Sequence, residues 1–294
     1  MDTAKAMVAS LWRFPVKSMQ GERLEQVELS ATGLVGDRAY ALVDAETGKV
    51  VSAKSVRLFP GILTCVAAFV EAPQAGHAPP PVRIALPNGT AVTSDSPDVN
   101  EVLSAFFGRP VSLARSAPED FTIDQYHPDL ENLDPAGHRD TVTEQKLGAA
   151  FFAAIGVPSP VPVGSFFDLF PLSVLTTSTL AHLSELRPES RFENQRFRMN
   201  IVVETDESGF VENAWVGQRV GIGDTVRLHV TMPDARCVMT TLAQGNLPRD
   251  NEILRTLARH NRLPLGAGAH PCAGVYAMVE APGAVRVGDR VEIG

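Results

Sequence analysis

Two short segments near the C-terminal end decide the fold: Val220-Gly-Ile-Gly-Asp-Thr-Val226 and Val285-Arg-Val-Gly-Asp-Arg-Val291. Each places a Gly-Asp pair between two short apolar stretches, and Gly and Asp are residues that tight turns favour. We therefore expect a β-hairpin at each segment. Alternating or apolar runs predict further strands at Asn200–Val203, Thr225–Val230, Gly274–Val279 and Arg290–Ile293. Two hairpins among these strands favour a closed β-barrel over a solenoid of repeats.

The N-terminal part is also predicted to be rich in strands, at Val8–Phe14, Leu24–Leu29, Ala39–Val43 and Ile62–Val70. Helices are expected at Asp98–Phe107, Lys146–Ile155, Thr177–Leu186 and Asp250–His260. These patterns predict a β-rich α+β fold with two modules. We expect an N-terminal β-barrel-like domain at 5–115, an acidic linker or loop at 116–145, and a C-terminal β-barrel with peripheral helices at 146–294.

The net charge of −8 is concentrated in one segment of the 294-residue chain. Residues 116–145 carry eight acidic residues and one arginine, and the flanking parts are nearly neutral. We expect this segment to be a solvated loop, with a docking face for a basic redox partner as the alternative. The balance argues against nucleic-acid binding. The sequence contains no run of 18 apolar residues and no signal-peptide layout, so we expect a cytoplasmic protein that does not bind membranes.

Among the three cysteines, Cys237 stands out because it directly follows Arg236. It lies just past a predicted strand that ends near Pro233, and a thiol beside a guanidinium loses its proton easily. A thiolate attacks electrophiles or binds soft metals. Cys65 and Cys272 are expected to be packed, and the three spacings match neither a disulfide framework nor a zinc or iron–sulfur ligand set.

Two groups of polar residues are candidates for holding an anion. Lys17 and Ser18 follow the turn residue Pro15, and Arg38 enters a predicted strand. Their alternatives are a surface lysine and an ion pair between Arg38 and its neighbour. A second group, Arg196, Arg198 and Asn200, would share one face if this stretch were a strand, with a solvated basic edge as the alternative. His127, His138 and His270 lie in predicted loops without ligand spacing, and we expect no chemical role for them.

Taken together, these segments resemble the MOSC family, the C-terminal domain of molybdenum-cofactor sulfurases preceded by an N-terminal β-barrel domain. The resemblance lies in ordered motifs over most of the chain: Phe14–Ser18, Ala31–Arg38, Lys54–Leu58, Pro171–Leu175, Arg196–Val203, Ala235–Thr241, Gly274–Tyr276 and Val285–Asp289. It is similar in particular to the family's amidoxime- and N-hydroxylamine-reducing members. Such a resemblance implies a molybdenum cofactor (Mo-molybdopterin) and an N-oxygenated small molecule as substrate.

The resemblance also implies roles for individual residues. Cys237 would be the thiolate ligand of molybdenum, with Arg236 keeping the sulfur ionised. The cofactor contacts implied by the family are Lys17, Ser18, Arg38, Thr177, Arg198, Asn200 and, more weakly, Tyr276. Asp234 departs from the family pattern and could alter the access or the pKa of the thiol.

The chain carries no ferredoxin-like cysteine set, so a reductase of this kind would need a separate iron–sulfur or flavin protein as electron donor. Two other functions remain open from the sequence. One is a sulfur carrier or sulfurtransferase with a persulfide on Cys237. The other is a non-catalytic protein that binds or delivers the molybdenum cofactor.

Overall fold

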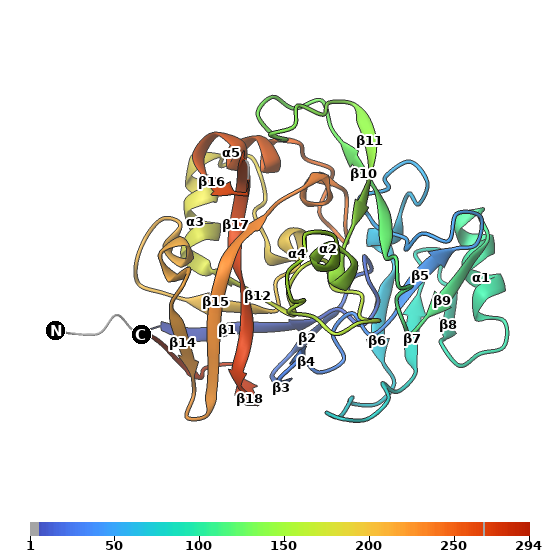
Figure 1. Cartoon of the computed structure of the whole chain (residues 1–294), viewed down its shortest axis with the longest axis horizontal. Helices are drawn as coiled ribbons and strands as arrows, with labels where there is room; N and C mark the ends of the chain where they lie inside the picture. The colour runs from blue at the N-terminus through green and yellow to red at the C-terminus, as the bar shows by residue number, and fades with distance from the viewer. Residues whose placement is uncertain (1–5, 267) are drawn as a thin grey trace.

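The computed structural model describes residues 6–266 and 268–294, and it contains a closed barrel of seven strands, whose labelled strands lie in the left part of Figure 1. The order around the barrel is β12, β13, β1, β19, β14, β15 and β17, and β17 pairs back with β12. Only the β12–β13 pair among these is parallel. The strands are β1 (Ala6–Arg13), β12 (Leu172–Thr176), β13 (Ile201–Glu204), β14 (Arg219–Ile222), β15 (Val226–Ala235), β17 (Gly268–Ala281) and β19 (Arg290–Ile293). The predicted barrel is therefore confirmed.

Only one of the two Gly-Asp segments forms the expected hairpin. Gly223 and Asp224 join β14 to β15, where Ile222 pairs with Val226. Gly288 and Asp289 instead lie between β19 and β18 (Gly283–Arg286), which belong to different sheets. β18 pairs with β3 (Gln26–Ser30), while β19 pairs with β1 and β14. The turn chemistry was identified correctly, but a Gly-Asp turn does not fix which strands its flanks pair with.

The first strand of the chain is built into the barrel formed by the C-terminal half. β1 lies between β13 and β19, and Leu11 of β1 faces Ile201 in the register with β13. The barrel interior is filled by buried aliphatic side chains from both ends of the sequence, because alternate residues of each strand point inward. They include Val8, Leu11, Val174, Ile201, Val220, Leu228, Val275 and Val291.

A second core lies in the N-terminal half, between small sheets and helix α1. The sheets are β5–β9 and β6–β7–β8, and Pro87-Asn88-Gly89 forms the turn between β7 and β8. Gly108 adopts φ 63° and caps α1. The elements around this core are β5 (Ala41–Asp44), β6 (Val66–Phe69), β7 (Val82–Ala85), β8 (Ala91–Thr93), α1 (Val99–Phe107) and β9 (Val111–Ala114). Two further short strands belong elsewhere: β2 (Glu22–Leu24) pairs with β1, and β4 (Gly33–Leu34) pairs with β3.

The acidic segment at 116–145, expected to be a linker or loop, contains most of an antiparallel hairpin. Strands β10 (Thr122–His127) and β11 (Thr141–Lys146) pair along their full lengths. Lys49 forms ion pairs with Asp124 and Glu144, so part of the acidic charge is compensated. The connecting loop, residues 128–140, reaches across to α5 (Glu252–His260), where Leu130 and Leu133 pack on Leu254 (Figure 1).

The remaining elements surround the barrel. They are α2 (Gly148–Ala154), α3 (Thr177–Leu186), α4 (Asn194–Phe197), β16 (Arg262–Leu265) and the short 3₁₀ helices at Ile62–Thr64, Val211–Trp215 and Val238–Thr241. In the described part of the chain, no helix combines the length and the apolar character needed to span a bilayer.

Candidate functional site

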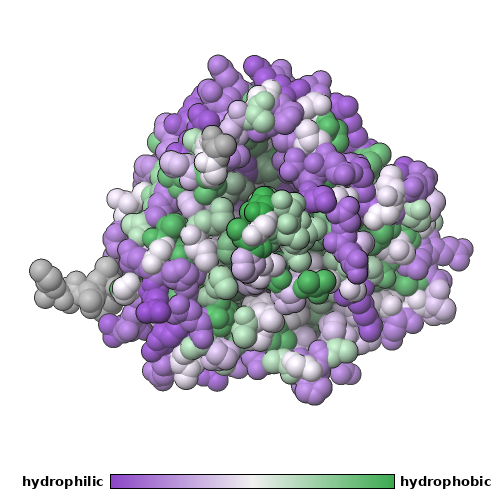
Figure 2. Space-filling view, in the orientation of Figure 1, coloured by the Kyte–Doolittle hydropathy of each residue, from purple (hydrophilic) through white to green (hydrophobic). Residues whose placement is uncertain are grey.

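A cavity of about 330 Å³ lies between the barrel and the N-terminal half. Its wall combines the turn at Lys17 and Ser18, the segment 166–170, the end of β15 and part of β17. Phe151 of α2 also lines it, and Figure 2 shows apolar residues gathered over α2 near the middle of that face. The cavity therefore joins residues that are far apart in the sequence.

Cys237 lies in this wall, directly after β15, and is partly exposed. The other two thiols are buried, and burial raises the pKa of both Cys65 and Cys272 to about 12. They are therefore inert at neutral pH, as the sequence predicted. Cys237 is the thiol that a ligand in the cavity can reach.

The cavity wall is strongly cationic, although the protein is acidic. It contains six cationic side chains (Lys17, Arg38, Lys54, Lys146, Arg198 and Arg236) against two carboxylates (Asp168 and Asp234). Asp37, which pairs with Arg38, adds a third carboxylate behind the wall. Because the whole chain carries −8, this excess is a local feature that favours an anionic ligand.

Asp168 joins the two lysines of the wall. It forms ion pairs with Lys17 and, at 2.8 Å, with Lys54, and Lys17 Nζ also donates to the Phe166 carbonyl. Burial lowers the pKa of Lys17, whereas the two lysines hold the pKa of Asp168 far below its usual range despite burial. Sequence reasoning missed both Lys54 and Asp168 as site residues. The scarcity of lysine and the Lys54–Leu58 motif offered a signal for Lys54, but Asp168 had none.

Three residues of the wall adopt left-handed backbone conformations that non-glycine residues rarely occupy. Ser18, Arg38 and Arg198 have φ values of 65°, 48° and 58°. They are three of the five non-glycine residues with positive φ in the described ranges 6–266 and 268–294. Such backbone strain persists where the surrounding structure enforces it, and it clusters at functional sites.

Arg198 is a buried cation without a carboxylate partner among the described residues. Its guanidinium donates to the Met19 carbonyl and lies 4.3 Å from the centre of the Phe14 ring. Burial, followed by repulsion from Arg38, lowers the pKa of Arg198 to about 9. Arg38 contacts the same ring at 4.6 Å but is paired with Asp37. An unpaired buried cation is costly, and an anion in the cavity would relieve that cost.

The expected strand face carrying Arg196, Arg198 and Asn200 is wrong. Residues 194–197 form α4, and Arg198 ends it in the left-handed conformation. Arg196 points away from the cavity wall and donates to the carbonyls of Thr240, Leu242 and Pro248. Arg198 and Asn200 nevertheless both line the cavity. The period of two residues that places strand side chains on one face does not apply here, because the helical turn of α4 interrupts the strand.

Arg236 lies beside Cys237 but is held by other partners. It pairs with Asp234 at 2.5 Å and donates to the Phe197 carbonyl, while its buried Nε finds no hydrogen-bond partner among the described residues. Asp234 is therefore engaged with Arg236. Although burial opposes the charge, nearby Asp234, Tyr276 and Cys237 raise the pKa of Arg236, so the residue stays cationic next to the sulfur.

Ser18 and Asn200, two further predicted site residues, line the cavity but are also hydrogen-bonded to the structure around it. Ser18 accepts a hydrogen bond from the Ala53 amide. Asn200 lines the cavity, but its side chain is used by Asp37, Ser173 and the Trp12 carbonyl. These contacts make both residues part of the support of the wall.

Tyr276 lies in the cavity wall, whereas Thr177 lies outside it. Tyr276 lines the cavity and stacks on Phe170, with ring centroids 5.4 Å apart. Thr177 is not among the lining residues and is the first residue of α3. The hydroxyl groups at the start of α3 bind Glu212 instead. The buried carboxylate of Glu212 accepts hydrogen bonds from Thr176 and Thr179. The prediction that Thr177 offers a donor to a ligand in this cavity therefore finds no support in its position.

Comparison with known proteins gives matches over most of the chain. The MOSC N-terminal beta barrel domain matches residues 5–69, and the MOSC domain matches residues 164–292. The human mitochondrial amidoxime-reducing component 1 is 26% identical, over 97% of this chain and 82% of its own. The human mitochondrial amidoxime reducing component 2 is 27% identical with the same coverage.

Among solved structures, the YUAD protein from Bacillus subtilis is similar over 99% of this chain and 98% of its own, with 12% identity and a TM-score of 0.44. The two domain matches contain most of the cavity wall, Lys17 to Lys54 in the first and Asp168 to Tyr276 in the second. The chain belongs to the MOSC family, in the arrangement in which a MOSC N-terminal β-barrel domain precedes the MOSC domain.

Proposed function

We propose that this protein is a molybdenum-cofactor oxidoreductase that reduces N-hydroxylated compounds with electrons from a separate redox protein. One observation carries the proposal: the reachable thiol of Cys237 lies in the wall of a cavity whose cations outnumber its carboxylates. The similarity to proteins named amidoxime-reducing components supports the substrate class.

The donor set fits a molybdenum cofactor. A thiolate is a soft ligand, which suits a metal centre of this kind. Arg198, buried and without a carboxylate partner in the described part of the chain, suits the cofactor's phosphate, with Arg38 and Lys17 beside it. Lys54 and Arg236 line the same cavity as Cys237 and add positive charge around its thiol.

When bound, the cofactor would supply two-electron redox chemistry at its metal, while the chain supplies binding and orientation. The reaction is balanced by two electrons and two protons, which convert an N-hydroxyl compound into the corresponding N–H compound and water. Burial, followed by the charge of Asp234, raises the pKa of Tyr276, so its Oη stays protonated at neutral pH. This hydroxyl lies at the cavity wall and donates to the Asp234 carboxylate, which also pairs with Arg236.

The first test is the molybdenum and pterin content of protein made in a cofactor-competent host. The wild type should carry nearly one molybdenum and one pterin per chain, and Cys237→Ala should lose the metal. Cys65→Ala is the matched control, because it removes a buried thiol outside the cavity wall and should leave the metal in place.

Activity is then measured with a simple amidoxime and a hydroxylamine, using reduced methyl viologen as electron donor. Turnover that follows the metal content supports the reductase. A loaded protein that reduces neither compound would favour a delivery role. Absence of metal and pterin from the wild type would overturn the proposal, and a persulfide on Cys237 would then be sought by mass spectrometry.

A further inference from the structure

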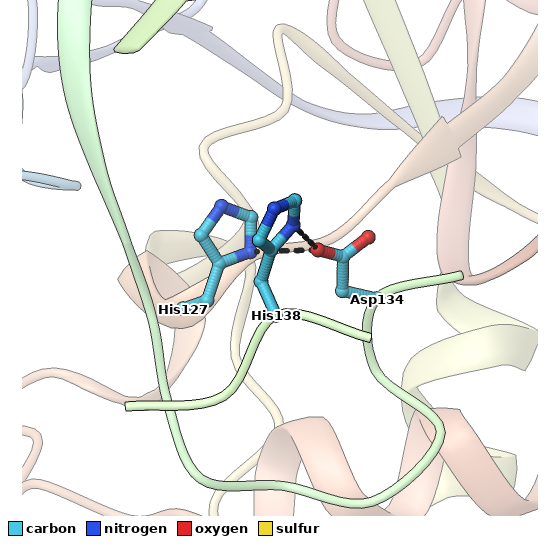
Figure 3. Close-up of side chains that lie close together, drawn as sticks. All are labelled: His127, Asp134 and His138. Carbon is cyan, nitrogen blue, oxygen red and sulfur yellow. Dashed lines mark hydrogen bonds and ion pairs between the residues drawn. The ribbon is translucent and has the colours of Figure 1, made fainter. Parts of the chain in front are cut away.

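A second group of chemically active side chains lies outside the cavity, on the β10–β11 hairpin. Figure 3 shows His127, Asp134 and His138 converging, with both imidazoles directed at one oxygen of the carboxylate. His127 ends β10, whereas Asp134 and His138 lie in the loop 128–140. These histidines have no ligand spacing along the chain, and it is the fold of the loop that brings His138 back to His127.

The ligand atoms of these three residues lie close enough together to share one metal ion. The Nδ1 atoms of His127 and His138 lie 3.3 and 2.5 Å from Asp134 Oδ2, and all three ligand atoms lie within 4.8 Å of one another. Ligands at about 2.0–2.1 Å from a tetrahedral zinc ion are separated by roughly 3.3 Å. The His127–Asp134 pair already has this separation, and the His138–Asp134 pair is shorter than it. His138 is half-exposed, so its ring is free to shift toward a position where all three ligands surround one ion.

The groups behind these ligands are also in place. His127 Nε2 lies 2.8 Å from Thr143 Oγ1 of β11, which fixes the ring with Nδ1 toward Asp134. The other carboxylate oxygen of Asp134 accepts a hydrogen bond from the Ala136 amide at 3.0 Å. Metal-binding histidines and carboxylates characteristically have such second partners, which orient the ligand atoms.

We propose that His127, Asp134 and His138 form a binding site for a divalent transition-metal ion of the zinc type. Two imidazoles and one carboxylate are ligands that Zn²⁺ and Co²⁺ accept, and three protein ligands leave a coordination position for water. This site is separate from the molybdenum chemistry proposed for Cys237.

The position of the site indicates its role. Gln125, two residues before His127 on the same face of β10, lines the cavity. The loop beyond His127 packs on the barrel side, where Pro135 lies so close to Gly268 that an added Cβ would be 2.3 Å from it. A metal ion here ties β10 to its own loop and holds that loop across the two halves of the protein beside the cavity.

The test measures Zn²⁺ binding to the full chain by equilibrium dialysis, in a Cys237→Ser background so that the cavity thiol cannot bind zinc. We expect one Zn²⁺ per chain. His138→Gln and Asp134→Asn should each weaken binding at least about tenfold, since loss of a second partner alone costs about 10–100-fold in metal affinity. His182→Gln is the matched control, because His182 also faces a carboxylate, Glu185, but without a second histidine.

Co²⁺ provides the second measurement, through the visible absorption that a tetrahedral ion gives. Cys237→Ser protein should show this band, and the same protein with His138→Gln should lose it; the half-exposed position of His138 lets this substitution leave the fold intact. Zinc binding that is equal in Cys237→Ser protein with and without His138→Gln or Asp134→Asn would be adventitious and would overturn the proposal. Absence of any stoichiometric zinc would do the same, and would leave the three residues as a hydrogen-bonded cluster.

Discussion

Replacing Arg198 by Met should make the cofactor-free protein more stable, although it removes a buried contact. The pKa of Arg198 is lowered from 12.5 to about 9 by burial and by Arg38, which corresponds to about 5 kcal/mol at about 1.4 kcal/mol per pH unit. Because the unfolded chain binds this proton more tightly, the cost is fully present below pH 9 and fades as the pH rises from 9 to 12.5.

Met has a similar length without the charge, so Arg198→Met removes this cost. It also loses the hydrogen bond to the Met19 carbonyl, worth about 2 kcal/mol for a charged donor, and the contact with the Phe14 ring, worth about 1 kcal/mol. The free energy of unfolding in urea should therefore rise by roughly 2 kcal/mol at pH 7. Arg38→Met is the matched control and should destabilise the protein, because it leaves the buried carboxylate of Asp37 without its guanidinium.

The same pair of variants tests the anion site. Pyrophosphate, a stand-in for the cofactor's phosphate, should raise the stability of the wild type and leave Arg198→Met unchanged. If Arg198→Met is several kcal/mol less stable than the wild type in the absence of any anion, the guanidinium is not a net cost. Arg198 would then be stabilised by the protein itself, and the cavity would not need an anionic ligand to offset a buried charge.

Two further predictions concern Asp168 in the cavity wall and the place of β1 in the barrel. Asp168→Asn should destabilise the protein by about 3–5 kcal/mol at pH 7, because it leaves Lys17 and Lys54 without their shared carboxylate. Because the pKa of Asp168 is lowered in the folded protein, its contribution to the free energy of unfolding is complete above the ordinary carboxyl pKa of 3.8 and is lost as the pH falls below it. The free energies of unfolding of wild type and variant, measured in urea, should therefore converge in acid. The isolated segment 164–294 lacks β1 and should therefore expose the edges of β13 and β19. We expect this fragment to aggregate unless residues 6–13 are supplied as a peptide. A monomeric, fully folded fragment would contradict the barrel topology.

The sequence could reveal what depends on neighbours along the chain. Cys237 follows Arg236 at the end of a strand, and the turn at Gly223 joins adjacent strands, so both were predicted from local patterns. Lys54 and Asp168 are 114 residues apart, and only the folded chain brings them together. Arg198 lies in the cavity wall, as predicted, but the reason for the prediction was wrong. The direction of its side chain comes from the left-handed end of α4 and not from strand alternation.

The pairing of β1 explains why the cavity can hold its strained and unpaired groups. Leu11 is fully buried in the C-terminal barrel, and a few residues later the same chain turns into the wall at Lys17 and Ser18. The other wall follows β15 and β17 of that barrel. Both walls are therefore anchored to one closed sheet, and closure lets them resist being pushed apart by the repulsion between the buried cations. This rigidity is what a preformed site for an anionic cofactor requires, because an adaptable wall would turn Arg38 and Arg198 outward to water.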